Sequence, residues 1–436
     1  MNNDEKLPKV LVIGINAWRE DGTAHTLMDI FRCWDPERLA LVYARTDMPN
    51  TDVCHHYFQI SEGQMIRSVL KPWIKVGCVV NNTPIVKNTD VEAEHTRYTK
   101  AHKTNSPWMP LMREIVWKLG QWKTPALKKF VQDFDPDIIF VPIYPNAYMG
   151  RIQRYITKLT SKPTVCYLAD DNYSYDSCQT ILQYIHRFWL RHHVGPIARS
   201  CKDMFVIVEK EKEDTDRRFG TSSKILTKCI DFTGKRYNHH KPNKPLRFVY
   251  TGSMIIGRDK TLALVADAIN EVNRQNGEVK AEMYIYSQTE PSDDIRKRIN
   301  NMASHFCGRV SREEVIRIQQ ESDVVIFAEA LEGKEANAAK LSFSTKITDY
   351  ISNGKCVLAI GKDYIAPIDY FKRNDSALIA YSKVDILEQV KRIVEHPDLV
   401  DLYGEKAFNC AIRNHEKNMM NQRFIETMCK AVKNER

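Results

Sequence analysis

Hydroxyl, lysine and aspartate side chains gather in the sequence LSFSTKITDYISNGKCVLAI, residues 341–360. Ser344 and Thr345 are residue types that begin a helix, because their side-chain oxygens accept from backbone N–H groups that lack partners there. Those N–H groups and the helix dipole attract anions, and Lys346 adds a full positive charge. Asp349, one turn later, could accept hydrogen bonds from ribose hydroxyls. The segment therefore suits a nucleoside diphosphate, and a capped surface helix is the alternative interpretation.

A second group of cations follows the apolar run 246–251. Gly252 lets the backbone approach a ligand closely, because it has no side chain. Arg258 and Lys260 are expected in a loop just before a helix at 261–272. A guanidinium suits bidentate phosphate binding, whereas an ammonium acts as a point charge. The alternative is a solvated loop with two surface cations.

Two adjacent carboxylates, Asp170 and Asp171, follow the apolar run 163–168. The ends of strands in α/β folds line the ligand cleft, so this pair could bind substrate hydroxyls or assist a proton transfer. A loop in which aspartate caps a helix is the alternative. Neither carboxylate has a visible partner for a metal site, and we expect no bound metal.

The chain resembles bacterial glycosyltransferases of the GT-B fold, in glycosyltransferase family 4, of the type that builds surface polysaccharides. In that family a segment of the kind S-x-P-T-K-x-x-E-Y-x-x-x-G-K-P-V contacts the nucleotide sugar. Asp349 stands where the family usually has glutamate, and Leu341 occupies the position of a further family glutamate. Ser344 and Cys356 replace the two prolines. The matching residues are Ser342, Thr345, Lys346, Asp349, Tyr350, Gly354, Lys355 and Val357.

The resemblance implies two Rossmann-like domains that face one another across a cleft. It implies transfer of a sugar from a nucleoside diphosphate donor to a glycan or lipid-linked acceptor, with retention of configuration and with no obligatory metal or other cofactor. Leu341 and Asp349 keep open the alternative of a non-catalytic GT-B-like protein that binds a glycan or nucleotide, or acts as a scaffold.

The resemblance also implies roles for individual residues. Arg258 and Lys346 would stabilise the departing diphosphate, as preorganised positive charge does, and Asp170 is a further catalytic candidate. Gly22 and Thr23 follow the first apolar run and open the first expected helix, near the expected sugar and acceptor, although an ordinary helix cap is an equal alternative. The donor-binding set is Gly252, Arg258, Lys260, Ser344, Thr345, Lys346 and Asp349, and the acceptor-side set is Gly22, Thr23, Asp170 and Asp171.

Apolar runs of strand length occur between helical patterns along most of the chain. Continuous runs of this kind are typical of parallel strands buried on both faces. A polar stretch with two prolines, 233–245, is the best linker. We therefore expect an α/β fold with domains at 1–235 and 246–415. The C-terminal segment, roughly 398–432, is expected to be nearly continuous helix, and the resemblance implies that helix 416–436 crosses back to the first domain. The expected strands are 10–13, 136–141, 163–168, 203–208, 225–226, 246–251, 281–286, 305–307, 324–327, 357–360 and 377–380.

Composition limits the kinds of partner. Among 436 residues, 64 Lys and Arg against 55 Asp and Glu leave a net charge of +9, which favours anionic partners such as nucleotide diphosphates and acidic lipids. The polar start, MNNDEKLPKV, does not predict a secretory signal, and no apolar run reaches the roughly 20 residues of a membrane span. Eleven cysteines without CxxC spacing indicate a reduced, cytoplasmic protein. No nucleic-acid-binding motif is present.

Tryptophan and cations cluster in two segments of the first half. One is the basic aromatic sequence RSVLKPWIK, which surrounds Trp73, and the other is the stripe within WMPLMREIVWKLGQW. Interfacial membrane helices combine tryptophan, leucine and lysine in this way. A helix that faces the core of the first domain produces the same stripe and is the main interpretation, with peripheral contact to an anionic membrane as the alternative. The stripe consists of residues 108, 111, 112, 115, 116, 119 and 122.

Overall fold

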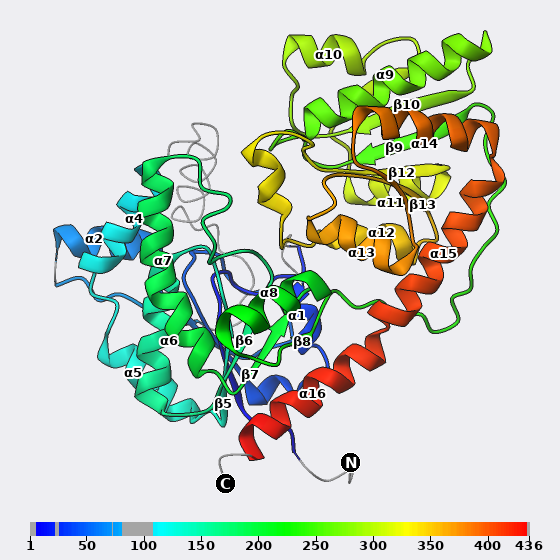
Figure 1. Cartoon of the computed structure of the whole chain (residues 1–436). Coiled ribbons are helices and arrows are strands. Elements are labelled where there is room, and N and C mark those ends of the chain that lie inside the picture. Colours follow the sequence, from blue (N-terminus) through cyan, green and yellow to red (C-terminus); the bar gives the residue numbers. More distant parts are fainter. Residues whose placement is uncertain (1–5, 22–25, 72, 81–107, 434–436) are drawn as a thin grey trace. The chain divides into compact units, whose positions relative to one another are not determined.

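The computed structural model describes residues 6–21, 26–71, 73–80 and 108–433 (Figure 1). These residues form two compact units. The first unit takes in the described parts of Met1–Ile207, Lys212–Thr227 and Met420–Arg436, and the second consists of Val208–Glu211 and Lys228–Met419. The C-terminal end of the chain therefore belongs to the first unit.

An eight-stranded sheet forms the centre of the first unit, in the order β4-β3-β2-β1-β5-β6-β7-β8. All neighbouring strands are parallel except β3 and β4, which pair antiparallel at one edge. The strands are β1 (Val10–Ile13), β2 (Leu39–Tyr43), β3 (His56–Gln59), β4 (Cys78–Val80), β5 (Ile138–Pro142), β6 (Thr164–Leu168), β7 (Asp203–Val206) and β8 (Lys224–Ile225).

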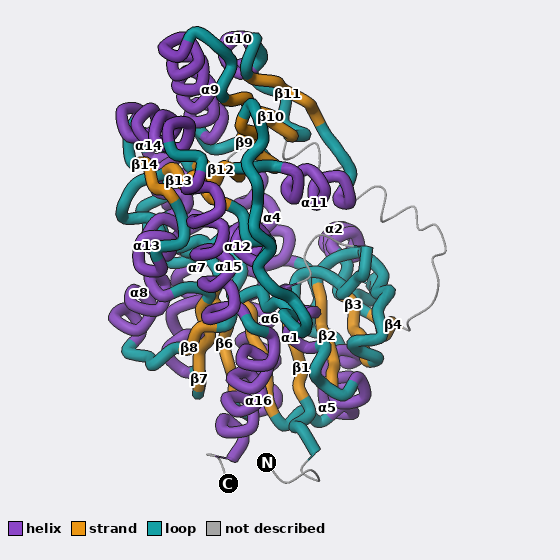
Figure 2. The backbone as a smooth tube through the Cα atoms, turned by 90° about the vertical axis from the view of Figure 1, so that its right-hand side faces the viewer, coloured by secondary structure: helices purple, strands orange, loops and turns teal. Residues whose placement is uncertain are grey.

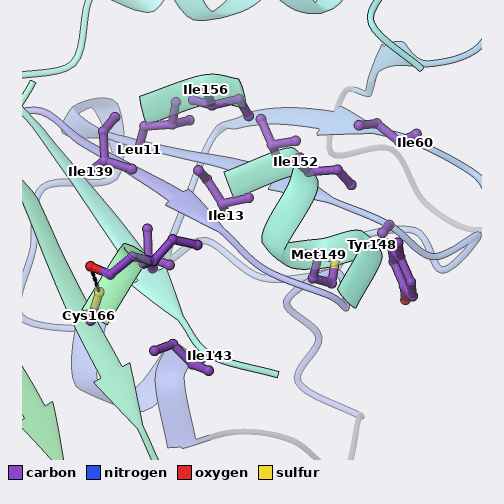
Figure 3. Close-up of a cluster of buried hydrophobic side chains, with 14 of the residues drawn as sticks. Leu11, Ile13, Ile60, Ile139, Ile143, Tyr148, Met149, Ile152, Ile156 and Cys166 are labelled. Atoms are coloured by element: carbon purple, nitrogen blue, oxygen red, sulfur yellow. Dashed lines mark hydrogen bonds between the residues drawn. The ribbon is translucent and has the colours of Figure 1, made fainter. Parts of the chain in front are cut away.

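Helices cover the sheet of the first unit and complete its core. Leu11 and Ile13 of β1 share this core with Ile152 and Ile156, one helical turn apart on α6 (Figure 3). The helices that lie wholly or mainly in this unit are α1 (Thr26–Phe31), α2 (Glu62–Leu70), α4 (Trp108–Leu119), α5 (Pro125–Phe134), α6 (Ala147–Thr160), α7 (Ile181–Ser200), α8 (Glu209–Phe219) and α16 (Lys417–Lys433), with a short 3-10 turn at Pro36–Arg38.

The second unit contains a six-stranded sheet in the order β11-β10-β9-β12-β13-β14, and every pair is parallel. The strand order reverses between β9 and β12, and the carboxyl ends of strands at such a point are where open α/β sheets bind ligands. The strands are β9 (Leu246–Thr251), β10 (Ala281–Tyr286), β11 (Ser304–Gly308), β12 (Val324–Ala328), β13 (Cys356–Ile360) and β14 (Leu378–Ala380).

Helices pack on the sheet of the second unit (Figure 2), and together they enclose a separate apolar core. The helices are α9 (Arg258–Asn276), α10 (Asp293–Ile299), α11 (Arg312–Glu321), α12 (Thr345–Ser352), α13 (Ala366–Asn374), α14 (Lys383–Glu395) and α15 (Asp398–His415), with a 3-10 turn at Lys334–Ala339.

The structure confirms the predicted α/β fold with parallel sheets. Each expected strand has a counterpart, whereas β2, β3 and β4 were not expected. The expected continuous C-terminal helix is interrupted at Glu416, whose backbone is extended (φ −63°, ψ 130°). The expected first helix starts at Thr26 in the described part of the chain.

The tryptophan-rich helix α4 buries a different face from the one that the main interpretation of its sequence predicts. Its buried residues are Leu111, Glu114 and Trp117. The Trp117 ring stacks on Tyr148 with 4.3 Å between centroids, and Glu114 accepts from Arg151 at 3.0 Å. These contacts fix which face points inward, so only part of the predicted stripe reaches the core. Exposed residues of α4 include Trp108, Met109, Met112, Ile115 and Leu119.

Candidate functional site

The end of β9 and the start of α9 bring a glycine and an arginine to the carboxyl edge of the second sheet. Gly252 has φ +148°, a conformation that favours glycine, and its N–H donates to the Tyr286 carbonyl at 2.9 Å. Arg258 is the first residue of α9, after Gly257 at φ +73°. The expectation that Arg258 lies in a loop before 261 is therefore wrong by about one turn, because Gly257 already caps the helix.

The Arg258 guanidinium forms a bidentate ion pair with Glu329. Its Nε and Nη2 donate to the two carboxylate oxygens of Glu329 at 2.9 and 2.8 Å. Glu329 directly follows β12 and is only 5% exposed, and its carbonyl accepts from the Thr261 hydroxyl at 2.9 Å. This pairing holds the guanidinium plane in one orientation while its remaining N–H groups can face a ligand.

Lys346 is the second cation of this site. It comes from α12, which follows β12, whereas Arg258 comes from α9, which follows β9. Its ammonium lies against Gly252, only 1.7 Å from the position that a Cβ would take there. The ammonium is 5.6 Å from the Tyr250 ring centroid. Burial and the charge of Arg258, opposed by Glu329, together lower the pKa of Lys346 to about 8. The three charged groups therefore act as one electrostatic cluster.

The beginning of α12 supplies backbone donors beside Lys346. Ser344 is the N-cap, with extended backbone (φ −73°, ψ 128°), and its side chain makes no capping hydrogen bond. Thr345 is the first helical residue. The first N–H groups of a helix have no partners within it, so this end can hold an anion. Sequence reasoning located this element correctly, down to the glycine that ends it, Gly354 at φ +64°.

Asp349 has a partner that the sequence did not suggest. Its Oδ1 accepts from the Lys228 ammonium at 2.5 Å, and both side chains are partly exposed. A ribose hydroxyl that donates to Asp349 would therefore share the carboxylate with Lys228 or displace it.

Lys260 does not join Arg258 and Lys346. Its side chain is 73% exposed and its ammonium is 4.0 Å from Glu335. Residues two apart on a helix point in nearly opposite directions, so when Arg258 faces the sheet edge Lys260 faces away from it. The structure favours the surface-cation interpretation for this residue.

The acceptor-side candidates belong to the first unit. Asp171 accepts from the backbone N–H groups of Tyr173 and Ser174 at 3.2 and 2.8 Å and from the Ser174 hydroxyl. Burial acts to raise the pKa of Asp171, but these hydrogen bonds outweigh it and the pKa lies below its ordinary value. Asp171 thus orders its own loop. Asp170 lies beside it at the end of the β6 segment, and Gly22 and Thr23 lie outside the described residues.

Glu329 is the residue that sequence reasoning missed. The available signal was a single carboxylate directly after five apolar residues, VVIFA, at the end of a predicted strand. The described residues hold no group of three or more His, Cys, Asp or Glu side chains arranged to bind a metal ion.

Comparison with solved structures identifies the fold. The chain superposes on HepE from Anabaena in complex with UDP, with a TM-score of 0.60 at 12% identity, over 97% of this chain and 100% of that one. Sucrose-phosphate synthase from Thermosynechococcus elongatus gives a TM-score of 0.60 at 9% identity, over 97% and 98% of the two chains. A glycosyltransferase from Rickettsia africae gives 0.57 at 11% identity, over 98% and 99%.

The similarity covers nearly the whole length of both partners in each comparison, and the shared fold is GT-B. No protein-family model matches the sequence, and a search of curated proteins finds no relative. The comparisons therefore show the fold of this chain and no more.

Proposed function

We propose that this protein is a glycosyltransferase that moves a sugar from a nucleoside diphosphate donor to a glycan or lipid-linked acceptor. One observation carries the proposal: Arg258 and Lys346 converge beside the N-terminus of α12, where the strand order of the second sheet reverses. The neighbour HepE, which has the same fold, is described in complex with UDP and with UDP-glucose.

The proposed chemistry is stabilisation of the leaving group. As the bond from the sugar to the diphosphate breaks, negative charge grows on the phosphate oxygens, and fixed positive charge lowers the energy of that state. Glu329 holds Arg258 in place before the substrate arrives. We propose that the two cations and the helix N-terminus supply this charge without a metal ion. The proposal includes retention of configuration, which the family resemblance implies.

A non-catalytic nucleotide- or glycan-binding protein is the second candidate. Leu341, which is buried, stands where the resembled family has a glutamate, and Asp349 is paired with Lys228. Both features affect recognition of the sugar and ribose and leave the diphosphate cluster intact. Slow hydrolysis of a bound donor sugar separates the candidates, because a binding protein would hold the donor without turnover.

The diphosphate site is tested by isothermal titration of UDP into Arg258→Ala and Lys346→Ala. Each variant loses a charged hydrogen-bond partner, which costs about 1.5–3 kcal/mol, or roughly a tenfold to hundredfold weaker affinity. Lys260→Ala is the matched control, because that cation is exposed and outside the cluster. Unchanged affinity in both cluster variants would show that the site is wrong.

The donor base and sugar are then found by thermal shift. A panel of nucleoside diphosphate sugars is added to the wild-type protein, and the ligand that binds most tightly raises the melting temperature most, by mass action. In the Arg258→Ala variant the ligands should no longer differ in how far they raise the melting temperature.

We also propose that the protein works at the cytoplasmic surface of an anionic membrane. Helix α4 packs beside both α2 and α7 (Figure 1). Together the three helices expose many large apolar side chains. No described helix is long and apolar enough to cross a bilayer. The exposed apolar residues of these helices and the loop after α2 include Leu70, Trp73, Trp108, Met109, Met112, Ile115, Leu119, Ile181, Ile185 and Phe188.

Co-sedimentation with vesicles tests this contact. Binding should rise with the fraction of anionic lipid and fall as salt is added, because each cation near the surface contributes only about 1 kcal/mol and is screened. Trp73→Ala combined with Met112→Ser should reduce binding, whereas Met302→Ser, which removes a 90% exposed methionine of the second unit, should not. A wild-type protein that ignores anionic vesicles at low salt would contradict the proposal.

A further inference from the structure

A cavity of about 240 Å³ lies on the second sheet, on the face opposite to α9. The alternate residues Phe248 and Tyr250 of β9, and Met283 and Ile285 of β10, belong to the apolar core with α9. Side chains of the intervening positions point to the other face. There the cavity is lined by Arg247, Val249, Tyr284, Tyr286, Val310, Glu314, Arg317, Ile318, Glu321 and Ser322.

This face of the sheet is only partly covered. Helix α11 packs against β9 (Figure 2). On β10 the positions Glu282, Tyr284 and Tyr286 are half-buried, although parallel sheets are usually covered on both faces. The result is a hollow with strand side chains as its floor and α11 as one wall. Arg258, Glu329 and Lys346 are not among the residues that line it.

The floor of the hollow is aromatic. The Tyr284 ring lies 5.0 Å from the His305 ring, centroid to centroid, and the Arg247 guanidinium is 5.7 Å from the Tyr284 centroid. The Tyr284 hydroxyl donates to Glu282 at 2.7 Å. Burial raises the pKa of Tyr284, and it raises that of Tyr286 to about 12, so both phenols stay neutral at physiological pH. The rings offer an uncharged, rigid surface for a ligand that stacks.

The charges around the floor cancel. Arg247 and Arg317 are balanced by Glu314 and Glu321, so the lining carries two positive and two negative groups. The lining therefore offers both hydrogen-bond donors and acceptors beside the aromatic surface, which matches a ligand whose hydroxyl groups both donate and accept. A nucleic acid or another polyanion would meet two carboxylates, and a basic ligand would meet two guanidinium groups.

We propose that this cavity is a second, non-catalytic binding site that holds one sugar ring of a neutral saccharide. Ligand pockets usually measure about 300–1,000 Å³, so a cavity slightly smaller than this range fits a single ring rather than a whole oligosaccharide. The choice of a saccharide agrees with the proposed function, but the site uses different residues and can be tested separately. Such a site would hold a growing glycan on the protein away from the diphosphate cluster.

Ligand-observed saturation-transfer NMR tests the cavity with two probes, methyl α-glucopyranoside and the neutral trisaccharide maltotriose. Both should receive saturation from the wild-type protein. Tyr284→Ala should weaken maltotriose binding at least fivefold, because stacking on the ring is lost. Arg317→Ala should also weaken it and should leave the core intact, because Arg317 lies on the exposed surface of α11. Tyr381→Ala is the matched control, a half-buried tyrosine of the same unit outside the cavity.

The outcomes distinguish this inference from the proposed function. UDP affinity should be unchanged in Tyr284→Ala and Arg317→Ala, whereas Arg258→Ala should bind UDP roughly tenfold to hundredfold more weakly and bind maltotriose as before. Absence of saturation transfer to both probes, or equal transfer in wild type and Arg317→Ala, would overturn the saccharide site. Binding of a short single-stranded RNA that depends on Tyr284 would overturn it in favour of nucleic acid.

Discussion

Among the candidate site residues, Lys346 has the environment that most strongly indicates an anionic ligand. A buried ammonium is costly unless an opposite charge accompanies it. Here Glu329, the carboxylate whose charge favours the ammonium, already forms a bidentate pair with Arg258, and the Arg258 charge adds to the cost. A diphosphate would supply the missing negative charge. The depressed pKa of Lys346 thus has a direct consequence for how binding depends on pH.

We expect UDP affinity to fall as pH rises above 8. Free Lys346 titrates at about pH 8, and a bound diphosphate raises that pKa because it stabilises the charged form. Binding therefore takes up a proton between the two pKa values, and the dissociation constant rises by at most tenfold per pH unit. Phosphate groups, with a second pKa of about 6, are already ionised in this range.

Calorimetry between pH 7.5 and 9.5 measures this effect. Lys346→Arg is the matched variant, since a guanidinium keeps its charge throughout and should give an affinity that hardly changes with pH. Proton uptake, read from buffers of different ionisation enthalpy, should disappear in the same variant. A wild-type affinity that is flat over this range would rule out contact between Lys346 and the diphosphate.

At the residue scale the sequence predicts the candidates but not their pairing. Arg258 and Lys346 were identified from type and position, and the structure brings them together. Glu329 was missed because nothing in VVIFAEA distinguishes a structural carboxylate from a solvated one until the β9–β12 pairing is known. Lys260 was grouped with Arg258 because a loop was expected, and the earlier helix start separates them.

At the element scale, α12 combines an anion site at its N-terminus with Asp349 one turn further on. We expect Asp349→Asn to weaken UDP binding by about 1–2 kcal/mol while inorganic pyrophosphate binds as before, because pyrophosphate has no ribose. Lys228→Met should tighten UDP binding slightly, since it frees the carboxylate from a partly exposed ion pair worth about 0–1 kcal/mol. Equal losses for UDP and pyrophosphate in Asp349→Asn would point instead to a structural role at the start of the helix.

The orientation of α4 shows what helical periodicity leaves open. Its sequence carries apolar residues on two adjacent stripes, so spacing alone does not say which stripe faces the core. Contacts with residues distant in sequence determine which stripe is buried: Trp117 stacks on Tyr148, and Glu114 pairs with Arg151. A glutamate within an apolar helix suggests the outward face, yet Glu114 is buried because its charge is paired.

The break between α15 and α16 also lacked a sequence signal. Glu416 caps α16, since its two carboxylate oxygens accept from the N–H groups of Asn418 and Met419 at 2.9 and 2.7 Å. Glutamate is not among the preferred capping residues, so an uninterrupted helix was the natural expectation. An isolated parallel β-bridge joins Ile230 to Glu416 and holds the extended conformation.

For the whole molecule, the alternation of apolar runs with helical patterns was sufficient to predict two α/β halves. The central strands are buried on both faces and read as continuous apolar runs, as in IIFVP and VVIFA. The strands that were missed include the edge strand β4 and its neighbour β3, where CVV is largely exposed and HYFQ mixes polar and apolar residues. β2, with LALVY, fits the apolar pattern and was overlooked.

The last helix, α16, contributes an aromatic side chain to the core of the first unit. The Phe424 side chain of α16 is fully buried. Its ring centroid lies 5.0 Å from that of Phe31, 5.6 Å from Trp34, 5.8 Å from Phe140 and 5.7 Å from Phe205. These partners come from α1, the segment after it, β5 and β7, so one side chain ties the end of the chain to four places in the first unit.

We therefore expect Phe424→Ala to destabilise the first unit by about 3–5 kcal/mol, the usual cost of truncating a buried phenylalanine. The second unit has its own core, so its unfolding, followed through the stabilisation that UDP provides, should change little. Calorimetric unfolding with and without UDP would then show one lowered transition that UDP does not shift and one nearly unchanged transition that it does. Ile412→Ala, on the exposed face of α15, is the control and should alter neither by more than about 0.5 kcal/mol. If Phe424→Ala leaves both transitions in place, α16 does not contribute to the stability of the first unit.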